Sequence, residues 1–329
     1  MKVLVTGANG FLGSWLTRAL SQQKGLEVYA LVRAESDLSE LESVKCTYVY
    51  GDITDLDSLY KAFTDVDTVF HTAGLIAYRK KDRAKMEKVN VFGTENVIDA
   101  CLTKKVRKLV YISSVVAVGA GFHPRQVLNE ESPYNVRPLN LGYFETKHAA
   151  ELLVLEAHKN KGLDCVVLNP STIYGEGDAK KGSRKTQVRV AQGRFKFYTS
   201  GGVSIVGVED VVNAILAAWE RGRNGERYIL AGENITIHEL FTIIAEEAGV
   251  EPPKYKIPNL VLFLLGRLGD WMDHFGVRGP LSTENAWTAI LYHWFDHSKA
   301  EKELGFKPRS AREAIRNSVS WMKKNGLLD

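Results

Sequence analysis

A glycine-rich turn directly follows the first apolar run of this chain. Val3-Leu4-Val5-Thr6 is typical of a buried strand, and the turn after it reads Gly7-Ala8-Asn9-Gly10-Phe11-Leu12-Gly13, before an amphipathic stretch from Ser14 to Leu20. The glycines allow a tight turn, close approach of a pyrophosphate and close packing of a helix whose N-terminus attracts phosphate. A glycine turn with a purely structural role is the alternative. Strand, turn and helix in this order predict a dinucleotide-binding fold whose cofactor contacts Gly7 and residues 9–13.

Short apolar runs rich in valine and isoleucine alternate with longer segments of helical period over the first half of the chain. This pattern is typical of an α/β protein with a parallel sheet covered by helices on both faces. We therefore predict a Rossmann-type, doubly wound parallel sheet. Its strands are expected near residues 2–6, 27–32, 45–50, 67–71, 107–113 and 163–169, and its helices near 11–22, 55–63, 83–103 and 143–160.

The pattern loosens after Pro170. A stretch rich in glycine and lysine precedes later elements, which are expected as helices near 209–220, 236–248 and 310–324 and a strand near 227–230. We predict a dinucleotide-binding domain over residues 1–170, to which segments near 203–230 return. Residues 171–329 are expected to form mainly a smaller, interleaved substrate-binding subdomain.

Composition and charge exclude several classes of protein. The 45% apolar and 25% charged residues are ordinary for a globular chain, and 43 Lys and Arg against 39 Asp and Glu leave a charge of +4, too small to indicate nucleic-acid binding. Three cysteines without CxxC spacing and eight histidines without an HExxH motif predict reduced thiols and no metal. No signal-peptide pattern is found, and the strongest apolar run, 260–265, is too short to cross a bilayer. We expect a cytoplasmic protein without a stable membrane span.

The end of the second predicted strand carries an arginine. Arg33 stands where an NAD-binding chain places an acidic residue against the ribose hydroxyls. An arginine can bind a 2′-phosphate, and the missing carboxylate removes the repulsion that would exclude it, so we predict NADP over NAD. A solvated surface arginine is the alternative. After the third strand, Asp52 is expected to accept a hydrogen bond from the adenine amino group, because Asp55 is better placed as the helix cap.

Two residues spaced by four open the helix expected near 143–160. Tyr143 and Lys147 therefore share one face of that helix. A phenol titrates near pH ~10, and an ammonium within ~4–6 Å favours its ionised form, which would make Tyr143 a proton donor and acceptor near neutrality. Ser113-Ser114 ends the fifth strand, where such sheets bind ligands, so Ser114 could steady the oxygen that Tyr143 protonates. A surface Tyr/Lys pair and a capping role for the serines are the alternatives.

The motifs taken together resemble those of extended short-chain dehydrogenases/reductases. TGANGFLG, GDITD, HTAG, VNVFGTENVIDA, YISS, YFETK and LNPSTIYGEGD occur in the order typical of that family. The resemblance covers almost the whole chain. It is greatest to the dihydroflavonol reductase and hydroxysteroid dehydrogenase branch of the NAD(P)-dependent epimerase/dehydratase superfamily.

The resemblance implies roles for particular residues. Ser114, Tyr143 and Lys147 match the family's catalytic triad, with Tyr143 and Lys147 also contacting the cofactor, and Asn90 matches an asparagine that shapes the site. Thr146 replaces a serine usual in the family. A homodimer formed through helices near 83–103 and 143–160 is also implied. The other implied cofactor contacts are Phe11, Leu12, Arg33, Asp52, Ile53, Ala73, Gly74, Pro170 and Ile173.

The substrate side offers apolar residues and one basic stretch. The apolar candidates for the pocket indicate a substrate with a ring or acyl body. They are Ile76, Val116, Tyr174 and Phe197, together with Leu75, Ala77, Tyr78, Phe122, Ile173 and the segment 260–275. Between Lys180 and Lys196 lie seven basic and no acidic residues, which favours a solvated loop over a phosphate-binding one. In 260–275, apolar residues recur at steps of three and four, as on one face of a helix. Core packing is the favoured interpretation of that face, with a pocket wall or a membrane-surface contact as alternatives.

Three functions remain open. The leading hypothesis is an NADP-dependent reductase of a ketone or aldehyde, with Tyr143 as general acid. A nucleotide-sugar epimerase or dehydratase would use the same tyrosine with a tightly bound cofactor, but the missing acid after the second strand and the apolar pocket candidates count against it. A nucleotide-sensing or scaffold protein without chemistry is the least favoured, because Ser114, Tyr143 and Lys147 are all present.

Overall fold

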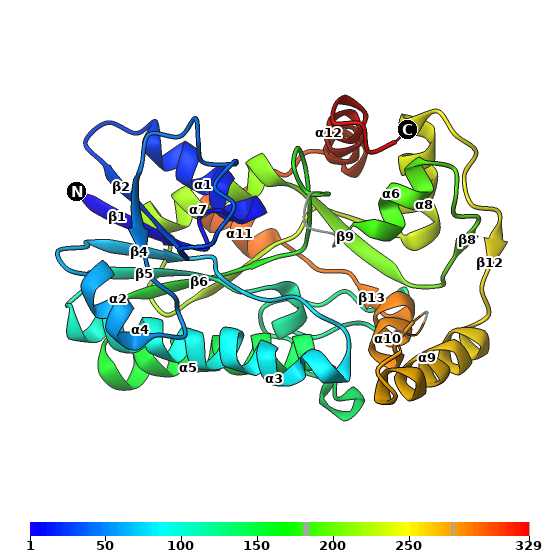
Figure 1. Cartoon of the computed structure of the whole chain (residues 1–329), viewed down its shortest axis with the longest axis horizontal. Coiled ribbons are helices and arrows are strands. Elements are labelled where there is room, and N and C mark those ends of the chain that lie inside the picture. Colours follow the sequence, from blue (N-terminus) through cyan, green and yellow to red (C-terminus); the bar gives the residue numbers. More distant parts are fainter. Residues whose placement is uncertain (180–183, 278, 280, 329) are drawn as a thin grey trace.

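A seven-stranded parallel sheet forms the main layer of the molecule (Figure 1). The computed structural model describes residues 1–179, 184–277, 279 and 281–328. Neighbouring strands are parallel throughout, in the order β10-β6-β5-β4-β1-β2-β3. The predicted α/β class and Rossmann-type sheet are confirmed. The strands are β1 (Lys2–Thr6), β2 (Glu27–Val32), β3 (Thr47–Tyr50), β4 (Thr68–His71), β5 (Lys108–Ile112), β6 (Cys165–Pro170) and β10 (Arg227–Leu230).

Helices cover both faces of this sheet because its strands are apolar on both sides. Val3 and Val5 pack into one hydrophobic cluster and Leu4 into the other, since successive side chains of a strand point to opposite faces. One face is covered by α1 (Phe11–Ser21), α7 (Val208–Arg221) and α11 (Ser298–Leu304). The other is covered by α2 (Leu56–Ala62), α4 (Gly93–Thr103) and α5 (Gly142–Lys161), as Figure 1 shows.

The strand order reverses between β1 and β4. From β1 the chain moves outward to β2 and β3, and then crosses to β4 on the other side of β1. The loops after β1 and β4 therefore diverge at the carboxyl edge of the sheet, where doubly wound folds bind dinucleotides. The glycine turn follows β1 and the segment 72–76 follows β4, so the topology brings both to this edge.

The helix expected near 83–103 consists of three successive parts. A short turn η1 (Lys80–Asp82) leads into α3 (Arg83–Met86), a wider π-helical stretch η2 (Glu87–Phe92) and then α4. A π insertion adds one residue to a turn and is often found at functional sites. Apolar periodicity does not reveal it, because the pattern on either side still reads as helix. The insertion contains the buried Asn90.

The later segments build a second, smaller set of elements on the right of Figure 1. A small sheet is formed by β7 (Thr172–Tyr174), β9 (Gly202–Gly207), β11 (Glu233–Thr236) and β13 (Tyr292–His293), and β8 (Phe197–Tyr198) pairs with β12 (Tyr255–Lys256). The helices here are α6 (Lys185–Ala191), α8 (Ile237–Ala248), α9 (Asn259–His274), α10 (Thr283–Ile290) and α12 (Ala311–Lys324). Short 3-10 turns are η3 (Val115–Ala117) and η4 (Arg137–Leu139). The division into domains at residue 170 stays a prediction.

The stretch 260–275 departs from the favoured interpretation. It is helical, as its spacing predicts, but Leu260, Leu264, Leu268 and Trp271 are exposed, so core packing of this face is wrong. Among the described residues, no helix combines the length and apolar character needed to cross a bilayer. The physical reason for the exposure is that α9 buries its small residues instead, as described below.

Candidate active site

The glycine turn after β1 is packed tightly against the loop after β4. Gly7 has a φ of +67°, and a Cβ there would lie 2.8 Å from the backbone of Ala73. A Cβ at Gly13 would lie 2.1 Å from the carbonyl oxygen of Gly7, so only glycine allows α1 to begin this close to the strand. The amide of Gly10 donates to the Gly7 carbonyl over 2.9 Å. This cradle fits the close backbone approach that a pyrophosphate requires.

The residues expected around the adenosine end lie at the same edge of the sheet. Arg33 is exposed and directly follows β2. The Asp52 carboxylate accepts hydrogen bonds from the amide and hydroxyl of Thr54, at 2.8 and 2.9 Å. Asp55 caps α2 through the amide of Ser58, which confirms the predicted cap. Ile53 is buried and Gly74 is exposed. An exposed guanidinium beside the glycine turn suits an anionic group on the ribose.

Lys147 is buried at the centre of the candidate site. Its ammonium donates to the hydroxyl of Tyr111 over 3.1 Å and to the carbonyl of Ile112 over 2.9 Å. Burial lowers the pKa of Lys147 to about 8, and the carboxylate of Glu151 opposes this shift. The lysine is thus held at the end of β5 by two oxygen acceptors.

Tyr143 begins the same helix and is also buried. Burial raises the pKa of its hydroxyl well above the usual value, the neighbouring Tyr78 adds to the rise, and a hydrogen bond with Ser114 opposes it. This differs from the expectation that the Lys147 ammonium favours the phenolate. The reason is that the ammonium is bound to Tyr111 and the carbonyl of Ile112, so burial decides the pKa of Tyr143.

The side chain of Ser114 contacts both the turn after β5 and Tyr143. It accepts a hydrogen bond from the amide of Val116 and so caps the turn η3. This is the capping role that was given above as an alternative for the serines. Ser114 also makes the hydrogen bond to Tyr143 noted above. Capping and contact with the tyrosine therefore occur together, because the cap fixes the hydroxyl at the carboxyl end of β5.

Asn90 links the loop after β4 to the helix α5. Its amide oxygen accepts from the amide of Leu75 over 2.7 Å, and its amide nitrogen donates to the Leu75 carbonyl and to the hydroxyl of Thr146, at 2.9 and 3.1 Å. Thr146 in turn donates to the carbonyl of Tyr143. The threonine that departs from the family's serine therefore supplies a hydroxyl at this position.

A buried ionic network behind the site was not anticipated from the sequence. Glu151 lies one helical turn after Lys147 and is 1% exposed. Its carboxylate accepts from the amide of Asn169 over 2.6 Å and pairs with Arg227 over 3.0 Å. Asn169 also donates to the carbonyl of Ser114 over 3.0 Å. A carboxylate on the buried face of α5, four residues after Lys147, is the sequence signal that could have revealed this network.

Four of the substrate candidates lie in different parts of the structure. Val116 packs beside Tyr143 in one apolar cluster, and Ile76, in the loop after β4, is 53% exposed. Tyr174 is fully buried in a different core cluster. Phe197 lies on β8 with its ring 6.1 Å from that of Tyr255. Tyr78, also a candidate from the sequence, lies beside Tyr143, with 6.0 Å between the two ring centroids.

Part of the basic stretch makes contacts within the protein. Arg184 lies 3.6 Å from the carboxylate of Asp178, and its guanidinium stacks 4.0 Å above the ring of Tyr174. Lys180 and Lys181 lie outside the described residues. Arg184 is therefore a packing residue rather than part of a solvated loop.

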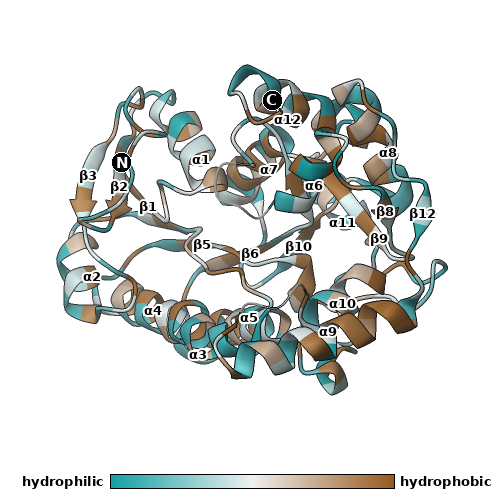
Figure 2. Ribbon diagram, turned by 45° about the vertical axis from the view of Figure 1, so that its right-hand side comes forward, coloured by the Kyte–Doolittle hydropathy of each residue, from teal (hydrophilic) through white to brown (hydrophobic). Residues whose placement is uncertain are grey.

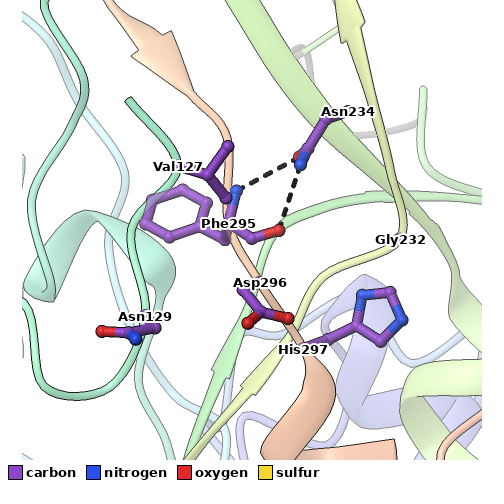
Figure 3. A pocket seen from close by; sticks show the side chains of 7 residues that line it. All are labelled: Val127, Asn129, Gly232, Asn234, Phe295, Asp296 and His297. Atoms are coloured by element: carbon purple, nitrogen blue, oxygen red, sulfur yellow. Dashed lines mark hydrogen bonds between the residues drawn. The ribbon is translucent and has the colours of Figure 1, made fainter. Parts of the chain in front are cut away.

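A surface hollow of about 380 Å³ lies elsewhere (Figure 3). Within it, the Asn234 side chain exchanges hydrogen bonds with the backbone of Phe295 at 3.1 and 3.2 Å. The hollow shares no residue with the candidate site among the described residues. Its lining residues are Val127, Asn129, Gly232, Asn234, Phe295, Asp296 and His297.

Curated proteins similar to this chain are named as enzymes. The sterol demethylase protein B of Methylococcus capsulatus is 32% identical and matches 100% of both chains. A putative dihydroflavonol 4-reductase of Synechocystis is 31% identical over 98% of this chain and 95% of its own length. A ketoreductase of a farnesylated dihydroquinoline oxide from Stigmatella aurantiaca is 30% identical over 94% of this chain and 92% of its own.

Solved structures share the whole fold. The crystal structure of gox2253 matches 99% of both chains with a TM-score of 0.87 and 34% identity. The dTDP-glucose 4,6-dehydratase DesIV of Streptomyces venezuelae, solved with NAD, matches 99% of this chain and 98% of its own with a TM-score of 0.80 and 23% identity, which shows the fold alone. The family model that matches residues 4–239 describes 3-beta hydroxysteroid dehydrogenases/isomerases. From the glycine turn to the tyrosine and lysine of α5, the chain therefore belongs to the 3-beta hydroxysteroid dehydrogenase/isomerase family, within the extended short-chain dehydrogenases/reductases.

Proposed function

We propose that the protein is an NADP-dependent reductase that converts a ketone or aldehyde on an apolar ring or acyl body into an alcohol. The observation that carries this proposal is the placement of Ser114 at the end of β5 beside α5, whose buried Tyr143 lies one helical turn before the buried Lys147. These residues lie at the carboxyl edge of the sheet, the same edge as the glycine turn. A proton donor there is in reach of a substrate that also meets the cofactor.

The cofactor would be held by the residues around this edge. The cradle formed by Gly7, Gly10 and Gly13 fits the pyrophosphate, and Arg33 fits the 2′-phosphate of NADP. When bound, the nicotinamide group supplies a hydride to the carbonyl carbon. The other residues proposed to contact it are Asn9, Phe11, Leu12, Asp52, Ile53, Ala73, Gly74, Asn90, Tyr143, Lys147, Pro170 and Ile173.

The protein's own residues would supply the proton and the orientation. Ser114 and Tyr143 would donate hydrogen bonds to the carbonyl oxygen, and Tyr143 would give up its proton as the alkoxide forms. The high pKa of the buried Tyr143 keeps it protonated until then. Lys147, charged below a pH of about 8, would restore the proton and stabilise the developing phenolate.

The apolar surroundings of Tyr143 support a substrate with an apolar body. Leu75, Ala77, Tyr78, Val116 and Trp287 pack against the same cluster as Tyr143. The names of two relatives, a dihydroflavonol reductase and a ketoreductase, agree with reduction of a carbonyl on a ring. A nucleotide-sugar substrate would need polar and cationic groups near Tyr143.

A homodimer is part of the proposal. Phe92, beside α4, and Leu152, on α5, are 52% and 40% exposed on the helices expected to meet a second subunit. Sedimentation at micromolar concentration should give the mass of two chains. A monomer there would contradict the proposed dimer and leave the proposed reaction untouched.

One experiment separates the candidate reactions. We would titrate the purified protein with NADPH and NADH by calorimetry, and then follow nicotinamide absorbance with ketones, aldehydes and nucleotide sugars. Tighter NADPH binding with net oxidation by an apolar ketone or aldehyde is expected. Preference for NADH, together with conversion of a nucleotide sugar without net oxidation, would establish the epimerase or dehydratase reaction instead.

A further inference from the structure

The outward side of α9 is apolar and exposed over its whole length. The exposed apolar side chains on this side form the α9 apolar face, and Figure 2 shows α9 largely in brown. Steps of four and three residues place them along one side of the helix. Their exposed fractions range from 37% for Leu265 to 70% for Leu260. The face consists of Leu260, Val261, Leu264, Leu265, Leu268 and Trp271, with Phe275 and Val277 just beyond the helix.

The inner side of α9 explains why these residues face outward. Leu262, Gly266 and Gly269 are buried. A Cβ at Gly269 would lie 1.7 Å from the carbonyl oxygen of Leu281, and one at Gly266 would lie 3.0 Å from the Cα of Thr283. The glycines thus let the helix backbone press directly on the segment before α10. This is the reverse of an ordinary amphipathic helix, which buries its leucines.

Acidic and basic side chains near the α9 apolar face differ in their exposure. Asp273 is 11% exposed and pairs with Arg79 over 2.5 Å, and Asp270 is 18% exposed and lies 3.8 Å from the Lys80 ammonium. Arg79 is also largely buried, at 13%, but the side chains of Lys80 and Lys81 beside these carboxylates are 75% and 51% exposed. Arg267, on the helix itself, is exposed at the border of the apolar face. The rim therefore presents cations to its surroundings while its carboxylates are turned inward.

We propose that the α9 apolar face docks on the surface of an anionic lipid bilayer, with the helix lying flat in the interface. An apolar helix face bordered by cations is what such a surface attracts. A second copy of the chain is the weaker occupant. Arg267 lies at the middle of α9, so a two-fold contact centred on the helix would bring Arg267 against its own copy.

The docking face is close to the candidate site. The hydroxyl of Ser282, which caps α10, donates to the carbonyl of Tyr78, and the ring of Tyr78 meets that of Tyr143 edge to face at 6.0 Å. Between the bilayer surface and Tyr143 lie α9, the segment 281–283 that packs on it, and Tyr78. If the proposed reduction holds, this placement favours a carbonyl substrate that partitions into lipid. Bilayer docking itself does not depend on that reaction.

The test is flotation of the full-length protein with vesicles, without cofactor or substrate. Vesicles of phosphatidylcholine and phosphatidylglycerol in equal parts are compared with pure phosphatidylcholine at about 0.1 M salt. We expect binding to the anionic vesicles, and at least about tenfold weaker partitioning for Leu264→Gln/Leu268→Gln. Arg267→Glu should weaken binding to anionic vesicles and leave binding to neutral ones unchanged.

A matched control is available. Trp271 and Tyr50 are 62% and 60% exposed, but Tyr50 lies on the edge strand β3, which is far from α9 (Figure 2). Trp271→Gln should reduce vesicle binding, whereas Tyr50→Gln should not. Equal binding of both variants, or a wild-type protein that stays free of both kinds of vesicle, would overturn the proposal. Loss of a concentration-dependent dimer in Leu264→Gln/Leu268→Gln, without any vesicle binding, would assign the face to a second copy.

Discussion

The carboxylate of Glu151 accepts a 2.6 Å hydrogen bond from the side-chain amide of Asn169. Through this contact the helix that carries Tyr143 and Lys147 is tied to the end of β6. Asn169 also holds the carbonyl of Ser114 over 3.0 Å. All three residues of the candidate triad are therefore fixed from behind by one buried carboxylate.

Glu151→Gln should destabilise the fold and alter the pH profile. It leaves the half-buried Arg227 without its charged partner, at a cost of about 1–3 kcal/mol. It also removes the group that raises the pKa of Lys147. As the pH rises, the lysine of the variant should therefore lose its charge earlier, and activity that depends on this charge should fall at a lower pH than in the wild type. Chemical denaturation and a pH series of rates measure both effects. Glu156→Gln, exposed on the same helix, is the control and should match the wild type.

Tyr143→Phe should lose turnover while it retains the cofactor. Removing a general acid typically costs roughly 10²- to 10⁴-fold in rate, and the ring itself still fills its place in the apolar cluster. Calorimetry with NADPH and a steady-state assay separate the two properties. Tyr255→Phe, an exposed tyrosine on β12, is the matched control. Near wild-type turnover in Tyr143→Phe would remove it from the role of proton donor.

Lys147 should make stability rise with pH. Its pKa falls from 10.5 to about 8 on folding, so between these values the unfolded chain binds a proton that the native protein has released. Stability then increases through this window, by on the order of 3 kcal/mol, relative to Lys147→Met. Denaturation of both proteins at several values of pH gives the difference directly. Parallel curves would show that the native lysine keeps its ordinary affinity for protons.

Arg33→Asp should reverse the preference between the two cofactors. It removes a cation that fits the 2′-phosphate and adds a carboxylate that repels it, so NADPH affinity should fall by about tenfold to hundredfold while NADH binding holds or improves. Arg107→Asp, an exposed arginine just before β5 at the opposite edge of the sheet, controls for the change in net charge. Unchanged discrimination in Arg33→Asp would leave Arg33 as a solvated surface residue.

Local patterns in the sequence were enough to predict the strands of the sheet and most of the helices that cover it, but not α11. The run Val3 to Thr6, the glycines at 7, 10 and 13, and the Tyr143/Lys147 spacing each depend on neighbours within about one or two turns of chain. The same holds for Asp55 as the cap of α2. These features follow from backbone geometry and hydrophobic period, which a single sequence displays.

Only the tertiary structure decided contacts between distant segments. It bound the Lys147 ammonium to Tyr111, joined Glu151 to Arg227 across 76 positions, and brought Tyr78 against Tyr143. It also turned the leucines of α9 outward, because Gly266 and Gly269 pack closer to their neighbours than a side chain allows. Periodicity shows that a helix has an apolar face, but which face meets the core depends on what other segments bring against it.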